Sequence, residues 1–232
     1  MDNATRLQYL QAMGIDVWVS RDCKSDEASL PVNDAKFNAS EPAENNVELV
    51  TDNWSALQQE VAECQKCELC KTRTQTVFGA GNVNADWMLV GDEPGEREDV
   101  EGKPFVGASG VLLTEMIRAI GLQRESVFIT NVIKCKPVDN RQARTEEVNS
   151  CNDFLQRQIA LVKPKLILAV GRMAAQTLLG SKEPLSGLRG KVHQLNGIPV
   201  VVVYHPAYLL RSVSEKSKAW QDLQLAMKQI RN

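Results

Sequence analysis

Two neighbouring carboxylates, Asp92 and Glu93, stand directly after an apolar run at about 86–91 and before the pair Pro94-Gly95. An apolar run that stops at glycine and proline predicts a buried strand leading into a loop. In an open α/β sheet, the loops at the carboxyl ends of the strands bind the ligands. Phe105 follows soon after, held between glycines and a proline. Carboxylates beside a fixed aromatic suit a pocket that stacks a flat ring and polarises water. The alternative is a solvated acidic turn.

Two further predicted strands end at residues with useful chemistry. Asn131 ends an apolar run at 127–131, and His205 follows the run at 199–204. If the strands are parallel, these side chains meet Phe105 at one edge of the sheet. A carboxamide both donates and accepts, so Asn131 could read the polar edge of a ring. His205 could donate to an oxygen on which negative charge develops. A turn asparagine and a structural histidine are the alternatives, and their joint placement favours a site.

The cysteines form a second constellation. We expect no secretion signal at the N-terminus, so a disulfide framework is not expected. Four thiolates can hold either a zinc ion or an iron–sulfur cluster, and their spacing does not choose between the two. Lysines beside the cysteines argue against four unrelated buried thiols, while Cys23 and Cys70 are spare. The candidate ligands are Cys64, Cys67, Cys135 and Cys151.

A third group of residues could contact nucleic acid. Leu209, Leu210 and Arg211 follow His205, and apolar residues beside a basic one can wedge into a base stack. The alternative is the start of a helix whose leucines are buried. Arg189 could contact a phosphate, although a surface turn explains it equally well.

Composition fits a protein that folds in water. The chain has 232 residues, of which 43% are hydrophobic and 24% charged, and no apolar run approaches the length of a membrane span. Residues 1–60 hold 4 Lys/Arg and 11 Asp/Glu, a net charge of −7, whereas residues 61–232 hold 23 and 18, a net charge of +5. A mildly basic body is compatible with a nucleic-acid partner.

The order of elements predicts an α/β fold. We expect an N-terminal extension at 1–60, made of a short helix at 5–19 and an acidic flexible linker at 20–48, followed by a domain at 61–232. Apolar strands alternate with amphipathic helices, which indicates a parallel sheet covered on both faces. The expected strands are 86–91, 127–131, 166–170 and 199–204, and the expected helices are 53–63, 109–120, 145–162, 172–180 and 215–230.

Short motifs follow one another in a fixed order from about Cys64 to Trp220. They are Cys64-x-x-Cys67, Val77-Phe78-Gly79-x-Gly81, Gly91-x-x-Pro94-Gly95-Glu96-x-Glu98-Asp99, Gly102-x-Pro104-Phe105-Val106-Gly107, Ile129-Thr130-Asn131, Lys134-Cys135-x-Pro137, Asn140-Arg141, Cys151, Arg189-Gly190 and His205-Pro206-x-Tyr208-Leu209-Leu210-Arg211. This series resembles the iron–sulfur (family 4) uracil-DNA glycosylases. The chain departs from the family at Asp92-Glu93, where the family usually has Glu followed by a small residue.

The resemblance implies a three-layer α/β/α sandwich with a four-stranded parallel sheet, and an enzyme that hydrolyses the N-glycosidic bond of uracil in DNA. The four candidate cysteines would hold a [4Fe–4S] cluster. Phe105 would stack on uracil, Asn131 would read its polar edge, and His205 would stabilise the leaving base. Asp92 or Glu93 would orient water. The DNA-contacting residues would be Arg189, Leu209, Leu210 and Arg211.

Two other functions remain open from the sequence. The altered Asp92-Glu93 pair and the acidic N-terminal segment are compatible with a non-catalytic DNA-binding or partner-docking protein on the same fold. The second open function is that of a glycosylase for another deaminated base, such as hypoxanthine. We expect a cytoplasmic, nucleoid-associated monomer that has no membrane contact, acts on single- or double-stranded DNA, and docks on a repair or replication protein through residues 1–60.

Overall fold

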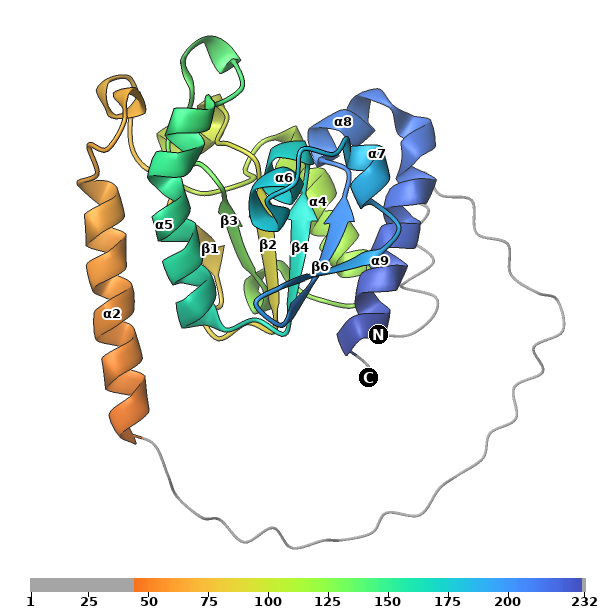
Figure 1. Ribbon diagram of the computed structural model, residues 1–232, viewed down its shortest axis with the longest axis horizontal. Coiled ribbons are helices and arrows are strands. Elements are labelled where there is room, and N and C mark those ends of the chain that lie inside the picture. Colours follow the sequence, from red (N-terminus) through yellow and green to blue (C-terminus); the bar gives the residue numbers. More distant parts are fainter. Residues whose placement is uncertain (1–43, 231–232) are drawn as a thin grey trace, which may run out of the picture.

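A six-stranded sheet forms the centre of the protein, whose computed structural model describes residues 44–230 (Figure 1). The strand order is β1-β3-β2-β4-β6-β5. The strands are β1 (Ala80–Gly81), β2 (Trp87–Gly91), β3 (Phe128–Asn131), β4 (Leu166–Val170), β5 (Val192–Leu195) and β6 (Ile198–Val203). The four inner strands, β3, β2, β4 and β6, are mutually parallel. They are the four strands expected from the sequence, so the predicted α/β class and its parallel sheet are confirmed.

The predicted number of strands was too small, because antiparallel strands flank the parallel sheet on both sides. At one edge β1 pairs with β3, and it is only two residues long, too short for a periodicity argument. At the other edge β5 pairs with β6 through a two-residue turn at Asn196-Gly197, where both residues have positive φ values, 50° and 83°. An Asn-Gly pair between two strands is the strongest short hairpin signal in a sequence. That signal was present in the chain.

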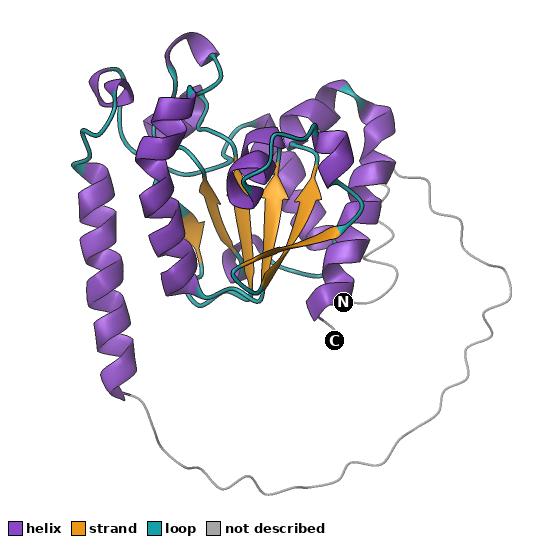
Figure 2. Cartoon of the chain, in the orientation of Figure 1, coloured by secondary structure: helices purple, strands orange, loops and turns teal. Residues whose placement is uncertain are grey.

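Every residue of β2, β3 and β4 is buried, because helices cover both faces of the sheet (Figure 2). Side chains that alternate along a strand therefore enter two separate cores. One core joins Leu89, Leu168 and Val201 to α4, α8 and α9. The other joins Met88, Ile167 and Val200 to α5, α6 and α7. The helices are α2 (Glu44–Ala62), α3 (Glu96–Glu101), α4 (Ala108–Ala119), α5 (Thr145–Val162), α6 (Arg172–Leu179), α7 (Leu185–Leu188), α8 (Pro206–Arg211) and α9 (Lys216–Ile230).

Helix α2 lies outside the layers and runs beside α5 (Figure 1). Leu57 and Val61 are fully buried against Phe78 and Phe154, and this packing holds the helix against the rest of the domain. The helix begins at Glu44, earlier than the expected start at 53, so it includes the last residues of the expected linker. Leu57 therefore packs with the domain that we expected to begin at residue 61. The expected helix at 5–19 and the linker as far as residue 43 lie outside the described residues.

Within residues 44–230, no helix combines the length and the apolar character that a membrane crossing needs.

Candidate active site

The parallel strands bring Asn131 and Gly91 together at their carboxyl ends, where the two residues are paired in register. A Cβ atom built on Gly91 would lie 2.4 Å from Asn131 Oδ1 and 2.5 Å from Phe105 Cζ. Gly91 therefore lies directly between the two expected ring-binding side chains, where the Cβ of any other residue would collide with both. Asn131 is 2% exposed, and among the described residues its Oδ1 finds no hydrogen-bond partner. A buried, unpaired amide oxygen is costly unless a ligand completes it.

The loop that carries Phe105 is fixed from two sides. Arg124 Nη2 donates to the carbonyl oxygens of Pro104 and Phe105, at 2.8 and 3.0 Å. The carboxylate of Glu98 accepts from the backbone N–H of Val106 at 3.1 Å. Phe105 itself has a positive φ of 54°, a conformation that is unusual for a bulky side chain. Such strain persists only where the surroundings impose it, so the ring position is imposed by the loop anchors.

His205 lies against Phe105, with ring centroids 5.5 Å apart and ring planes at 29°. It caps helix α8, and its Nδ1 lies 3.1 Å from the backbone nitrogen of Ala207. A backbone N–H can only donate, so Nδ1 must accept and the ring proton of the neutral imidazole is on Nε2. Burial lowers the pKa of His205 to about 4. The histidine is therefore a neutral hydrogen-bond donor at physiological pH.

The two neighbouring carboxylates have different surroundings. Asp92 Oδ1 accepts from the backbone N–H of Ala174 at 2.8 Å, and the carboxylate lies against Gly171 at the start of α6. This contact satisfies a free backbone N–H of the helix and places negative charge at its N-terminus. Burial raises the pKa of Asp92 to about 6, against the lowering effect of these backbone hydrogen bonds. Asp92 thus holds the start of α6, and its expected catalytic role stays a prediction.

Glu93 is the second of the two carboxylates. Burial, and next the charge of Asp92, raise its pKa to about 7. In the described part of the chain, Glu93 Oε2 is buried without a hydrogen-bond partner. Asp92 and Glu93 both line an open cleft of about 670 Å³, which His205 also lines, and a second cleft of about 430 Å³ between α5 and α6. A carboxylate with a raised pKa at the edge of a cleft has properties of a general base.

The four expected cysteine ligands come together, although Cys64 and Cys67 precede the sheet and Cys151 lies on α5. They line one pocket, which Cys70 also lines. Arg73 Nη1 donates to Cys135 Sγ at 3.0 Å. Burial raises the pKa of Cys135 to about 11, and it also raises the pKa values of Cys67 and Cys151. No three His, Cys, Asp or Glu side chains of residues 44–230 converge on a position for a single metal ion.

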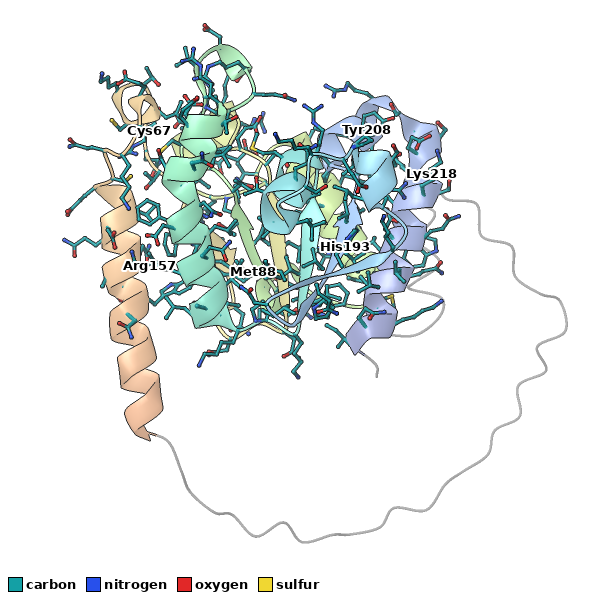
Figure 3. The ribbon with its side chains drawn as sticks, in the orientation of Figure 1. Cys67, Met88, Arg157, His193, Tyr208 and Lys218 are labelled. Carbon is teal, nitrogen blue, oxygen red and sulfur yellow. The ribbon has the colours of Figure 1, made fainter. Side chains whose placement is uncertain are left out.

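The structure separates the expected DNA-contacting residues into exposed and enclosed ones. Leu210 on α8 is 44% exposed and Arg211 is also exposed, whereas Leu209 is 1% exposed and belongs to the core. Tyr208 on α8 is labelled in Figure 3 at the end of the molecule toward which the parallel strands point, the same end as Cys67. An exposed leucine and arginine at this end suit a surface that meets DNA.

Arg189 has partners inside the protein. Its Nε donates to Asp222 Oδ2 at 2.7 Å, and its Nη2 donates to the carbonyl oxygen of Lys218 at 2.8 Å. The guanidinium also stacks on the ring of Tyr204, 4.1 Å from the ring centroid. Its side chain is only 10% exposed. In this arrangement Arg189 holds α9 beside the strand end that precedes His205, and its expected phosphate contact stays a prediction.

Four residues that support the site were not singled out from the sequence for these roles. Gly91, Glu98 and Arg124 shape or anchor the Phe105 pocket, as described above. The fourth, Lys134, is fully buried and donates to the backbone oxygen of Asn131. Gly91 and Glu98 belong to motifs that the sequence displays, but Arg124 lies outside them. Only the three-dimensional structure reveals that its side chain reaches back to the Phe105 loop.

Taken together, these features define an α/β domain that places Phe105, Asn131 and a neutral imidazole at the carboxyl edge of a parallel sheet, together with a pocket lined by cysteines. Residues 78–224 match the sequence profile of the uracil DNA glycosylase superfamily. The type-4 uracil-DNA glycosylase of Archaeoglobus fulgidus is 45% identical over 159 residues, which cover 65% of this chain and 80% of that protein. The type-4 uracil-DNA glycosylase of Thermotoga maritima is 42% identical over 158 residues, which cover 67% and 82%. The chain therefore belongs to the uracil DNA glycosylase superfamily, and its relatives place it among the type-4 members.

A type-5 uracil-DNA glycosylase of Pyrobaculum aerophilum is more distant, at 29% identity over 146 residues, 56% of this chain and 64% of that protein.

Proposed function

We propose that this protein excises uracil from DNA by hydrolysing the N-glycosidic bond, the first step of base-excision repair. The observation that carries the proposal is the buried Asn131 Oδ1, unpaired among the described residues, beside the fixed ring of Phe105. A flat base stacked on Phe105 presents its polar edge to this amide, which can accept through Oδ1 and donate through Nδ2. Uracil has both an N–H and carbonyl oxygens on that edge.

The leaving base is stabilised by His205. As the bond between N1 of uracil and C1′ of the sugar breaks, the electron pair stays with the base and negative charge spreads to its oxygens. A neutral imidazole that holds its proton on Nε2 donates a hydrogen bond to such an oxygen, and this bond strengthens as the charge grows. Because the pKa of His205 is lowered to about 4, this role needs no protonation of the ring at neutral pH.

The attacking water is held by Glu93. The carboxylate lines the cleft with His205 and has a free oxygen, so it can orient a water molecule toward C1′ and accept its proton as the new carbon–oxygen bond forms. The products are the free base and DNA with an abasic sugar. Asp92 supports this chemistry indirectly, because it fixes the start of α6 next to the cleft.

We further propose that Cys64, Cys67, Cys135 and Cys151 hold a [4Fe–4S] cluster. The residues fit such a group in three ways. The four thiols line one pocket, although they come from the segment before the sheet, the loop after β3 and α5. The guanidinium of Arg73 already donates to the sulfur of Cys135. The raised pKa values of the buried thiols call for a bound cation to deprotonate them. When bound, the cluster would supply a structural crosslink between the loops and α5.

The decisive experiment measures uracil release from single- and double-stranded oligonucleotides by protein purified without oxygen. We expect release by the unsubstituted chain and a fall of about 10²–10³-fold in His205→Ala, the size typical of losing one such donor. His193→Ala is the matched control, because His193 is the other histidine of the chain and lies on β5, bonded to Leu188 (Figure 3). Absence of release above a no-enzyme control, by protein with a full iron content, would refute the proposal.

We also propose that the protein acts as a monomer on nucleoid DNA in the cytoplasm, and that residues 1–60 dock on a repair or replication protein. The net charge of −7 in that segment supports a docking role separate from the basic body. Light scattering after size-exclusion chromatography checks the monomer, and a dimer mass would contradict it. Fluorescence microscopy of the tagged chain, with and without residues 1–43, checks the location and the docking.

A further inference from the structure

Lys134 is buried inside the protein, and its amino group bonds only to neutral acceptors among the described residues. The side chain is 1% exposed. Its Nζ donates to Thr130 Oγ1 at 2.7 Å, to the backbone oxygen of Asn131 at 2.7 Å and to Gln158 Oε1 at 2.6 Å. All three acceptors are neutral, and no ion pair joins Lys134 to an acidic residue in the part of the chain that the structure describes. A buried ammonium group is costly unless nearby groups compensate its charge.

The acceptors of Lys134 belong to a closed network. Thr130 Oγ1 donates to the backbone oxygen of Phe78 at 2.8 Å, and Gln158 Nε2 donates to the same oxygen at 2.9 Å. The network therefore joins the end of β3, the middle of α5 and the loop before β1. Such a fully satisfied buried network fixes its members in one arrangement. The member that matters for the site is Asn131, whose amide group enters the ring-binding pocket.

The same lysine touches the cysteine site. It directly precedes Cys135 in the chain, and it lines the cysteine pocket together with Cys135 and Cys151. One residue thus borders the expected metal site and holds Asn131 through its amino group.

We propose that Lys134 is a positioning residue that holds Asn131 in place for base reading and ties that placement to the cysteine site. The inference rests on the proposed function for the role of Asn131. The amide that reads the base is therefore held through the same residue that borders the bound group.

The test compares Lys134→Met with Lys136→Met in the full chain, both with measured iron content. Lys136 is the matched control, because it has the same charge on the other side of Cys135, yet makes none of the hydrogen bonds found for Lys134 within residues 44–230. We expect Lys134→Met to raise the inhibition constant for free uracil about tenfold, or about 1.4 kcal/mol. Binding to DNA that already contains an abasic site stays within about threefold, since that product has no base to read.

A second readout is independent of activity. Hydrogen exchange followed by mass spectrometry reports the opening of β3, and we expect the amides at 128–132 to exchange at least about tenfold faster in Lys134→Met than in Lys136→Met. Thr130→Val removes one acceptor and keeps the lysine, so it shows the same changes at a smaller size, about threefold. This variant carries the test should Lys134→Met fail to fold.

Each outcome decides the matter. An unchanged inhibition constant and unchanged exchange in the folded variants would overturn the positioning role, even if less protein folds. Equal effects of Lys134→Met and Lys136→Met would also overturn it, because they would reflect charge alone. If the unsubstituted chain neither releases uracil nor binds it, the proposed function fails, while hydrogen exchange still decides whether Lys134 positions Asn131.

Discussion

Asp92 binds the start of helix α6 through the backbone N–H of Ala174, with Oδ1 and the nitrogen 2.8 Å apart. The neighbouring Glu93 has a buried oxygen with no hydrogen-bond partner among the described residues, so the two adjacent carboxylates have different surroundings. We expect Asp92→Ala to lower the free energy of unfolding by about 0.5–2 kcal/mol, as other losses of a helix cap do. Asp92→Asn keeps an acceptor oxygen and stays within about 0.5 kcal/mol of the unsubstituted chain. Urea unfolding measures both values.

Glu93→Gln tests the other carboxylate. Gln has nearly the same shape but cannot accept a proton from water, so we expect kcat for uracil release to fall by about 10²–10⁴, the usual contribution of a general base. Single-turnover kinetics on one oligonucleotide measures this rate. A larger loss of kcat in Asp92→Asn than in Glu93→Gln would show that the assignment of the two residues is reversed.

The pH dependence of activity follows from the raised pKa of Glu93. The residue acts in its ionised form, so kcat falls about tenfold per pH unit below the pKa of about 7 and is level above it. Neutral His205 adds no step above pH 5, because its pKa is about 4. A pH–rate profile from pH 5 to 9 measures this curve, and Glu93→Gln should flatten it. If the fall in kcat below pH 7 is unchanged in Glu93→Gln, the titrating group is another residue.

The same group makes stability depend on pH. Its pKa rises from 4.5 in the unfolded chain to about 7 in the folded protein, so the folded state binds more protons between these values. Linkage then requires the free energy of unfolding to fall as pH rises from about 4.5 to about 7. We expect Glu93→Gln to remove this part of the slope. Urea unfolding at pH 5 and pH 8 for both proteins provides the comparison.

Leu209 and Leu210 are adjacent and should respond differently to truncation. Leu209 is buried, so Leu209→Ala should cost about 2–5 kcal/mol of unfolding free energy. Leu210 is exposed, so Leu210→Ala should change stability by less than about 0.5 kcal/mol. If Leu210 enters the base stack, its loss lowers excision from double-stranded DNA more than from single-stranded DNA, where no stack has to be opened. Equal losses on both substrates would contradict a wedging role.

Arg189 and Arg211 provide a similar pair for DNA binding. Arg189 is held by Asp222, so Arg189→Gln should destabilise the fold by about 3–5 kcal/mol, as the loss of one partner of a buried ion pair does. Arg211 is exposed, and if it contacts a phosphate as expected, Arg211→Gln reduces the slope of log binding constant against log salt by about one. Fluorescence anisotropy from 50 to 300 mM salt measures the slope. A reduced slope in Arg189→Gln would instead support the predicted contact between Arg189 and a phosphate.

The sequence was sufficient to predict the parallel strands and which residues lie at their carboxyl ends. Strand runs that are apolar on both faces revealed β2, β3, β4 and β6, and their last residues marked the edge of the sheet on which Asn131 and His205 lie. The flanking strand β5 was missed because its partly exposed residues lack an apolar run. The different roles of Asp92 and Glu93 depend on which one reaches α6, and no local pattern shows that. The same holds for Arg124 and Lys134, whose contacts join segments far apart in the chain.

The order of the strands has a consequence for biosynthesis. Glu93 follows β2 and Asn131 ends β3, but His205 follows β6, the last strand of the sheet. β6 pairs with β4 and with β5, so it can dock only after both the centre of the sheet and the preceding hairpin strand exist. A growing chain on the ribosome therefore carries no complete pocket until the segment beyond residue 205 has emerged. A partly synthesised chain therefore lacks the histidine that completes the site.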